Sequence, residues 1–300
     1  MNDAHTDRLT RFLIQEGGVR GVHVRLDEAW AQVRTRAPYP DAVARLLGEA
    51  VAASALFTGH AKVDGRLAVQ LRGSGALRTL FAECTAAGTV RGIAALAEGA
   101  GEVTEPLQAL GHDGLLAITI ENPGLRGQEP ARYQGLVSLG QPTLAEAFED
   151  YFRQSEQLPT RLLLAADDGR VAGLMLQKLP GDEGDADGWE RASALFDTLG
   201  GAELLETPAD RLLHRLFHED GVQVLGDKDL RFGCTCSRER VAGMLESLGE
   251  AEAREAAAGH GGEVEVHCEF CGQRYVFDGP DLDALFTPGP ASVPAPERLQ

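Results

Sequence analysis

Four of the five cysteines in this 300-residue chain fall within 38 residues near its C-terminus. Cys234 and Cys236 are separated by one residue, and Cys268 and Cys271 are separated by two. Two such thiol pairs are a common way for a protein to supply the four ligands of a tetrahedral zinc ion. The sequence therefore predicts one zinc site held by these four side chains.

The residues around the second pair are typical of a metal-binding turn between two strands. Residues 263–268 and 273–278 alternate apolar and polar side chains, and Gly272 stands where a positive φ is needed. Residues 237–249, between the two pairs, are expected to form a helix that packs on this turn. Its apolar face would consist of Val241, Met244, Leu245 and Leu248.

Three further residues could in principle bind metal or react, but we expect other roles for them. His260 and His267 lie near the second pair, and His267 should point to the opposite face of its strand from Cys268. Neither is expected to bind the metal. Cys84 follows an apolar segment and is predicted to be a small core residue.

The chemistry of such a site allows two interpretations. A module this small has little core, so the metal would supply much of its folding free energy. Zinc-bound sulfurs are thiolates, the form that oxidants attack, so oxidation of all four would release the ion and unfold the module. The same pattern also fits a zinc site that stays closed permanently, and spacing alone favours this simpler interpretation.

The N-terminal 180 residues are predicted to form one α+β domain. Residues 19–26 alternate like a half-buried strand, and residues 161–179 indicate a hairpin that turns at Asp-Asp-Gly. Apolar residues at helical spacing predict helices over 39–61 and 142–158, the second beginning at Pro142. Because strands and helices do not alternate regularly, we expect a mostly antiparallel sheet packed with helices.

A segment rich in Pro, Gly and acidic residues at 180–188 marks the end of this domain. Residues 189–220 predict short amphipathic helices broken at Gly200–Gly201 and at Pro208. Short helices are marginal alone and depend on docking. We therefore expect 181–230 to be a metastable helical linker, although composition alone favours an ordinary helical subdomain.

The rest of the chain and its composition limit the possible partners. Residues 231–288 form the predicted zinc module, and residues 289–300 are expected to be a disordered tail. The formal net charge of −18 disfavours nucleic-acid binding. No apolar run of 18 residues, secretory signal or G-x-x-x-x-G-K-[ST] motif is present. We therefore expect a cytoplasmic protein, with reduced thiols, that binds neither membranes nor ATP.

Three other functions compete with a redox switch. An enzyme with a structural zinc would need a catalytic set such as His112, Asp113 and Glu121, whose geometry nothing in the sequence fixes. A thiol–disulfide oxidoreductase would place its Cys-x-x-Cys motif at the start of a helix after a strand, rather than in a hairpin. A zinc ribbon that binds DNA or RNA is disfavoured by the acidic charge.

The order of the cysteine pairs and several longer stretches resemble the redox-regulated 33-kilodalton chaperonin family, a bacterial heat-shock holdase. The resemblance covers nearly the whole chain. The stretches that carry it are VRGVHVRLDEAW, YQGLVSL, EDYFRQSEQLPTRL, LLHRLFHED, FGCTCSRERV and CEFCGQRYVFD.

This resemblance implies an ATP-independent chaperone, not an enzyme, that protects thermally unfolding and oxidatively damaged client proteins from aggregation. The reduced form would be inactive and would hold one zinc per chain on the four cysteines. Oxidative stress would pair Cys234 with Cys236 and Cys268 with Cys271, release zinc and unfold the linker. The N-terminal domain would contribute to client binding, and activation would be accompanied by homodimer formation.

Overall fold

The computed structural model describes residues 7–124, 129–137, 139–181, 184–259 and 261–287. The chain divides into two compact units, residues 1–234 and 235–300, and each is considered by itself. His260, the predicted tail at 289–300 and part of the acidic segment at 180–188 lie outside the described residues. The predicted boundaries near residues 180 and 230 stay a prediction.

The first unit contains a five-stranded antiparallel sheet with the order β10-β1-β2-β9-β8. Both the predicted strand at 19–26 and the predicted hairpin at 161–179 are confirmed. The strands are β1 (Arg8–Ile14), β2 (Val19–Leu26), β8 (Thr160–Ala166), β9 (Val171–Lys178) and β10 (Val222–Asp229).

Strand β10 lies within the predicted linker at 181–230, after the helices expected over 189–220, and the sequence analysis did not predict it. The helical region ends at Asp220, and Gly221 then adopts a left-handed conformation with φ of 70°. From Val222 onward the chain pairs antiparallel with β1, whose Ile14 lies opposite Val222. Because this strand is largely exposed and its partner is distant in the sequence, hydrophobic alternation does not mark it.

A second sheet has the order β11-β5-β4-β3-β6-β7. Its pairs are antiparallel except for the short β11, which runs parallel to β5. The predicted α+β class with mostly antiparallel sheet is thereby confirmed. The strands are β3 (Arg66–Arg72), β4 (Leu77–Thr85), β5 (Thr89–Leu96), β6 (Leu115–Asn122), β7 (Ala131–Val137) and β11 (Arg231–Phe232), with a 3-10 turn, η1, at Gln108–Leu110.

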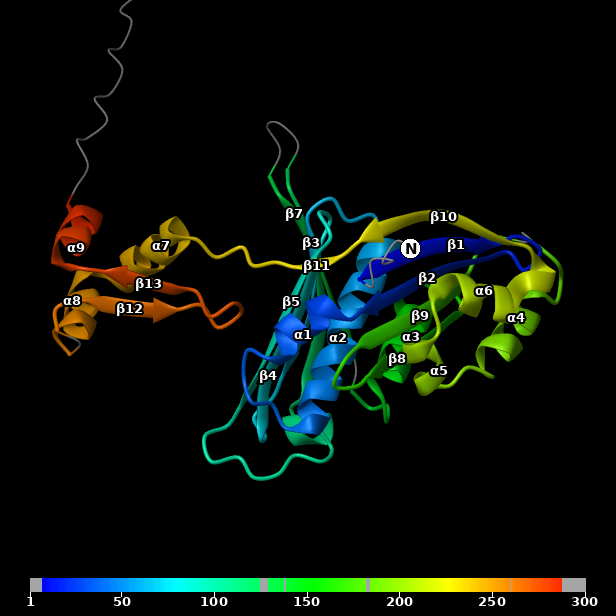
Figure 1. Cartoon of the computed structure of the whole chain (residues 1–300), viewed down its shortest axis with the longest axis horizontal. Coiled ribbons are helices and arrows are strands. Elements are labelled where there is room, and N and C mark those ends of the chain that lie inside the picture. The colour runs from blue at the N-terminus through cyan, green and yellow to red at the C-terminus, as the bar shows by residue number, and fades with distance from the viewer. Residues whose placement is uncertain (1–6, 125–128, 138, 182–183, 260, 288–300) are drawn as a thin grey trace, which may run out of the picture. The chain divides into compact units, whose positions relative to one another are not determined.

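Helix α2 (Asp41–His60) packs against strands of both sheets and forms the centre of the core (Figure 1). Many of its residues are alanines, which let both sheets approach its backbone closely. Its length and composition would also suit a membrane span, but 78% of that apolar window is buried inside the protein, as in a core helix.

Two other helices cover this core. Helix α1 (Glu28–Arg34) buries Trp30, whose indole Nε1 donates a hydrogen bond to the carbonyl oxygen of Asp167 at 2.9 Å. Helix α3 (Leu144–Ser155) begins two residues after the predicted Pro142. Thr143 caps it, because its side chain accepts from the backbone of Glu146 and the Glu146 carboxylate accepts in return.

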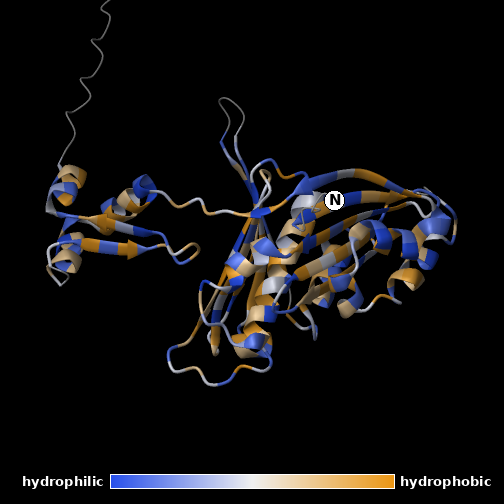
Figure 2. Ribbon diagram, in the orientation of Figure 1, coloured by the Kyte–Doolittle hydropathy of each residue, from blue (hydrophilic) through white to orange (hydrophobic). Residues whose placement is uncertain are grey.

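Three short helices pack on the face of the five-stranded sheet that is opposite α2. These linker helices are α4 (Gly188–Phe196), α5 (Gly201–Glu206) and α6 (Ala209–Phe217), followed by the 3-10 turn η2 (His218–Asp220). The predicted breaks at Gly200–Gly201 and Pro208 are confirmed. Polar and apolar residues alternate along these helices (Figure 2), and their apolar faces bury Leu174 and Leu176 of β9.

The second unit is small. Its elements are α7 (Arg238–Leu248), α8 (Glu250–Ala258), β12 (Val264–His267), β13 (Arg274–Phe277) and α9 (Gly279–Phe286). The helix expected over 237–249 is present, but its expected apolar face is partly wrong. Leu245 is buried, whereas Met244 and Leu248 are exposed, because α7 packs mainly on α8 and α9.

Candidate metal centre

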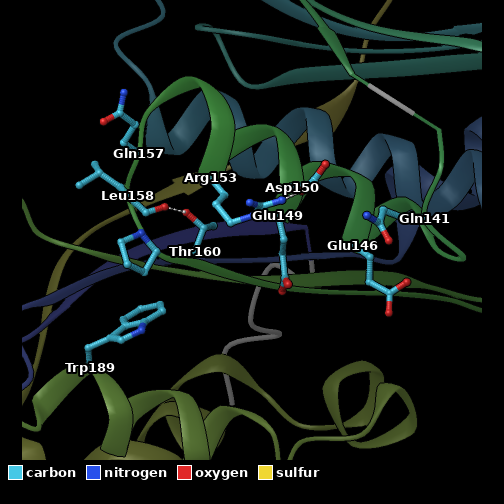
Figure 3. Close-up of a pocket in the computed structure, with 10 residues that line it drawn as sticks. Gln141, Glu146, Glu149, Asp150, Arg153, Gln157, Leu158, Thr160 and Trp189 are labelled. Atoms are coloured by element: carbon cyan, nitrogen blue, oxygen red, sulfur yellow. Dashed lines mark hydrogen bonds and ion pairs between the residues drawn. The ribbon is translucent and has the colours of Figure 1, made fainter.

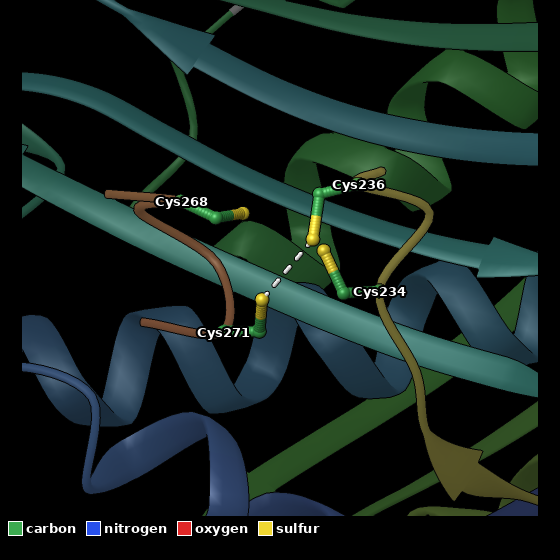
Figure 4. A group of neighbouring side chains, drawn as sticks. All are labelled: Cys234, Cys236, Cys268 and Cys271. Carbon is green, nitrogen blue, oxygen red and sulfur yellow. Dashed lines mark hydrogen bonds between the residues drawn. The ribbon is translucent and has the colours of Figure 1, made fainter. Parts of the chain in front are cut away.

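The structure brings together the four cysteines that the sequence singled out. The sulfurs of Cys234, Cys236, Cys268 and Cys271 all lie within 4.8 Å of one another and point to a common centre (Figure 4). The Cys236 and Cys271 sulfurs are 3.3 Å apart. A tetrahedral zinc–thiolate site has sulfurs about 3.8 Å apart, so this donor set fits zinc without large movement.

Different elements hold the two members of the first pair. Cys234 follows β11, whose register is extended by a hydrogen bond from the Gly233 amide to the Val90 carbonyl at 3.1 Å. Cys236 directly precedes Ser237, the N-cap of α7, whose hydroxyl accepts from the Arg240 amide at 3.3 Å. Because the chain between these two anchors is extended, a single intervening residue is enough for both sulfurs to reach the common centre.

The second pair lies on the predicted turn between β12 and β13. The Cys268 carbonyl accepts from the Gly272 amide at 2.7 Å, and the Cys268 amide donates to the Gln273 carbonyl at 2.9 Å. Gly272 has a φ of 71°, as expected from its position after Cys271. The turn therefore directs both sulfurs of this pair to one side.

Two polar side chains donate hydrogen bonds to the sulfurs. The Tyr275 hydroxyl lies 3.1 Å from the Cys236 sulfur, and this contact, together with burial, raises the pKa of Tyr275 to about 12. Arg91 Nη1 lies 3.7 Å from the Cys234 sulfur. Donors of this kind stabilise thiolates and orient metal ligands. The sequence analysis missed both, and nothing near Arg91 in the sequence connects it with a cysteine 143 residues away.

Arg91 is itself held by a buried carboxylate. Arg91 Nε donates to Glu83 Oε1 at 3.0 Å, and the Glu83 side chain is only 3% exposed. Burial alone would lower the pKa of Arg91, but Glu83 and the Cys234 sulfur outweigh it and raise that pKa. The guanidinium therefore stays charged beside Cys234.

The remaining candidates lie elsewhere. His267 is exposed, and its Nε2 lies 2.6 Å from Glu265 rather than among the four sulfurs. Cys84 is fully buried, as predicted, and burial raises the pKa of its thiol to about 11. Buried thiols of this kind react slowly with oxidants.

The possible catalytic carboxylates are engaged in local structure. Asp113 accepts from the Ser74 hydroxyl at 2.7 Å, and Glu121 pairs with Arg66. His112 is exposed on the loop before Asp113. These contacts give the two carboxylates separate structural partners.

A cavity of about 560 Å³ between α3, β8 and the start of α4 also has acidic walls (Figure 3). Glu146 belongs to the cap of α3, Glu149 accepts from the Leu162 amide at 2.7 Å, and Asp150 pairs with Arg153. Burial raises the pKa of Glu149. Because each of these carboxylates already has a structural partner, the cavity does not hold the paired carboxylates of an acid–base site.

These observations define a class of protein: an α+β core with a docked set of short apolar helices, followed by a small unit at a four-cysteine metal-type centre. The family model described as Hsp33 protein matches residues 7–278. The chain therefore belongs to the Hsp33 family.

Relatives agree with this assignment over nearly their whole length. A 33 kDa chaperonin of Chromobacterium violaceum is 43% identical over 95% of this chain and 96% of its own. One from Ectopseudomonas mendocina is 44% identical over 96% and 98%. The crystal structure of a 33 kDa chaperonin from Thermotoga maritima superposes with a TM-score of 0.74 at 25% identity, covering 94% of this chain and 98% of that one. The family is one of chaperones, which act on unfolded proteins.

Proposed function

We propose that this chain is a redox-regulated, ATP-independent holdase that is inactive when reduced and zinc-bound. The observation that carries the proposal is the convergence of four half-buried sulfurs on one centre. It is supported by short linker helices whose apolar faces are covered only while they stay docked on the sheet. The bound clients would be unfolding proteins, in the cytoplasm and without a role for nucleic acid.

In the reduced state, Cys234, Cys236, Cys268 and Cys271 would together hold one metal ion per chain. Zinc, when bound, keeps the sulfurs as thiolates and ties the first pair to the second. Tyr275 and Arg91 donate to Cys236 and Cys234, and so help to orient these ligands.

Oxidation would form the disulfides Cys234–Cys236 and Cys268–Cys271. Each disulfide forms from two thiolates with the release of two electrons, and one molecule of hydrogen peroxide accepts these electrons with two protons from the solvent to give two molecules of water. Both pairs are local, so no sulfur remains to link residues 234–236 to the turn at 268–271. The small core of the second unit then has to hold the fold alone.

Unfolding of the second unit would allow the adjacent linker to undock from the sheet. We propose that 181–230 acts as the metastable segment between a client-binding domain, 1–180, and the zinc module, 231–288. Undocking would expose the apolar faces of α4 to α6 and the sheet residues beneath them. Exposed apolar surface binds unfolding chains without nucleotide, and it would also favour the homodimer proposed for the active state.

The test measures zinc content and aggregation suppression on the same samples. Reduced protein should carry one zinc per chain and leave a thermally unfolding test protein free to aggregate. Protein treated with peroxide at raised temperature should have lost zinc and should prevent aggregation. The matched control is Cys84→Ser, which should switch like the parent because Cys84 lies outside the four-sulfur group.

The same measurements can also contradict the proposal. If zinc stays bound after peroxide treatment and neither form suppresses aggregation, the site is a permanently closed structural one. The function of the chain would then have to be sought in its N-terminal domain.

A further inference from the structure

Two histidines lie one helical turn apart at the end of the linker helices. His214 is on the last turn of α6, and His218 follows that helix at the start of η2. Their imidazole rings stack, with centroids 5.1 Å apart and an angle of 14° between the ring planes. Residues four apart share one face of a helix, and this is the spacing of the two histidines that bind zinc in H-E-x-x-H helices.

Both rings of this histidine pair are accessible to solvent. His214 and His218 are exposed, whereas Leu216 and Phe217 between them are buried against the sheet. The two imidazoles therefore contribute little to the packing that docks α6. An ion in solution can reach them while the linker stays docked.

A hydrogen bond determines which nitrogen of His218 is available to a metal. Its Nδ1 lies 2.9 Å from the carbonyl oxygen of His214, and because a carbonyl can only accept, Nδ1 carries the proton of the neutral ring. Nε2 then has the lone pair that a metal needs. Histidines that bind metals usually donate their other ring nitrogen to a carbonyl or a carboxylate in this way, and the hydrogen bond orients the ring.

The acidic residues around the pair favour a cation. Glu219 Oε1 lies 3.9 Å from His218 Nε2, and the Glu219 side chain is 87% exposed, so it can turn toward an ion. Asp210 precedes His214 by one turn on the same face of α6. The formal net charge of the chain, −18, adds to this preference.

Two arginines of α6 lie near the pair in the sequence, and neither blocks it. Arg215 pairs with Glu203 at 2.6 Å. Arg211 is exposed, and its long side chain can turn into solvent. A guanidinium has no lone pair to offer, so neither arginine competes as a ligand.

We propose that His214 and His218 chelate a divalent transition-metal ion of the zinc type, through one imidazole nitrogen each, with the Glu219 carboxylate beside the ion. Rotation of the two side chains from their stacked arrangement brings the nitrogens to the spacing that one ion requires. Water completes the coordination, so this site is more open than the four-cysteine centre and binds zinc more weakly.

Chelation depends on the state of the linker, and this step rests on the proposed holdase function. Spacing by four residues brings two imidazoles together only while this part of the chain is helical. Short helices such as α6 have little stability unless they are docked. An ion that binds the helical form therefore stabilises the docked linker by mass action.

The binding test uses the full-length, reduced protein after loading with one zinc per chain, so that calorimetric titration with zinc chloride detects only a further ion. One additional ion per chain should bind. His214→Ala and His218→Ala should each weaken this binding by about 100-fold, because a single imidazole loses the gain from chelation. His112→Ala is the matched control, since His112 is also an exposed histidine of the first unit, and it should bind like the parent.

Three results would overturn the proposal. The first is the lack of saturable binding of a further ion below about 1 mM zinc. The second is equal affinity in His214→Ala, His218→Ala and His112→Ala, which would place the further ion elsewhere. The third is binding of half an ion per chain, which would mean that the histidines bridge two chains. Because the three replaced side chains are exposed, each variant should fold like the parent, and circular dichroism checks this.

The effect on the linker is tested with the same proteins. Added zinc should slow proteolysis of the linker and delay activation by peroxide in the parent more than in His214→Ala. Rebinding of zinc to the cysteines affects both proteins alike, so the difference between them reports on the histidine pair. An equal delay in both would mean that the ion does not act on the linker.

The site and the holdase function can fail separately. If zinc binds with the expected variant pattern while oxidation never produces a chaperone, the histidine site stands and the holdase proposal fails. If oxidation produces a chaperone while no histidine variant changes zinc binding, the holdase proposal stands and the site is refuted.

Discussion

Among single residues, Arg91 has two separable roles. It neutralises the buried Glu83 carboxylate, and it donates to the sulfur of Cys234. Arg66 Nη1 also lies 3.5 Å from Glu83, so removal of Arg91 leaves that carboxylate partly compensated. Stability and metal retention should therefore respond differently to changes at these positions.

Arg91→Met should lower the free energy of unfolding by about 3 kcal/mol, because Glu83 loses its main partner in a buried site. It should also weaken zinc binding by about tenfold, as loss of an outer-sphere donor does. Adding Glu83→Gln should restore most of the stability but not the zinc affinity. Denaturant titration and competition with a chromogenic chelator measure the two quantities.

The control for this pair is Arg132→Met, since the exposed Arg132 lies 3.7 Å from Glu121 and should change stability by less than about 0.5 kcal/mol. Equal zinc affinity in Arg91→Met and the parent would show that the 3.7 Å contact with Cys234 has no role in ligand binding.

His23 should make stability depend on pH. Burial, and then the nearby Arg25, lowers its pKa from 6.5 to about 4. The other polar groups around the cavity that it lines are those of Arg8, Thr10, Asp210 and Asp227. Between pH 6.5 and 4 the unfolded chain binds more protons at this position than the folded one, so His23 lowers stability as the pH falls through that window.

Glu49 acts in the opposite direction, because burial raises its pKa to about 7 and the folded state takes up its proton first as the pH falls. Glu49 is present in both proteins, so its effect on the pH dependence of stability cancels when His23→Phe is compared with the parent. From pH 7 to pH 5 the parent should lose about 2 kcal/mol of stability relative to His23→Phe. Urea titrations at both values measure it, and a constant difference would mean that His23 is not held neutral by burial.

At the scale of the elements, local signals predicted the structure well and long-range pairing was missed. Helix α2 and the β8–β9 hairpin have strong periodicity and an Asp-Asp-Gly turn, and both appear as expected. Strands β1 and β10 were not identified because each is defined by the other, about 200 residues away. Helix α8 was missed because its run of Ala and Glu gives no clear apolar face.

The docking of α6 depends on a few large side chains. Phe217 is fully buried and stacks on Phe12 of β1, with ring centroids 6.4 Å apart. Phe217→Ala should cost about 4 kcal/mol of packing free energy. Because the short linker helices have little stability of their own, this loss should appear as undocking.

Limited proteolysis should therefore cut the linker of reduced, zinc-loaded Phe217→Ala faster than that of the parent, and this variant should suppress aggregation without oxidant. Leu225→Ala is the control, since Leu225 on β10 is 53% exposed and its loss removes little buried surface. If the linker of Phe217→Ala stays protected from proteolysis and the variant does not suppress aggregation, docking of the linker does not depend on this contact.

For the whole molecule, the site was easier to predict than its surroundings. Residue types that can bind zinc are few and these cysteines are closely spaced in pairs, so the grouping of Cys234, Cys236, Cys268 and Cys271 could be predicted from the sequence, and the structure brings their sulfurs together. Arg91 and Tyr275 act through contacts that only the folded chain creates. The same holds for the cavity at His23, which requires α6 to lie on the sheet.

The two units differ greatly in how much core they contain, and this should make their stabilities separable. Among its described residues, the second unit buries a small cluster around Leu245, Val264, Phe277 and Leu282, whereas α2 is enclosed by two sheets. Most of the folding free energy of the small unit would then come from metal binding.

Removing zinc from reduced protein with a strong chelator should abolish hydrogen-exchange protection in peptides from residues 264–286 and leave that of 41–60 unchanged, as mass spectrometry can measure. Protection that survives at 264–286 after complete metal removal would mean that this small core folds by itself, and that zinc loss alone cannot start the switch. Protection lost at 41–60 would mean that the units unfold as one, which contradicts a stable first unit that remains to bind clients.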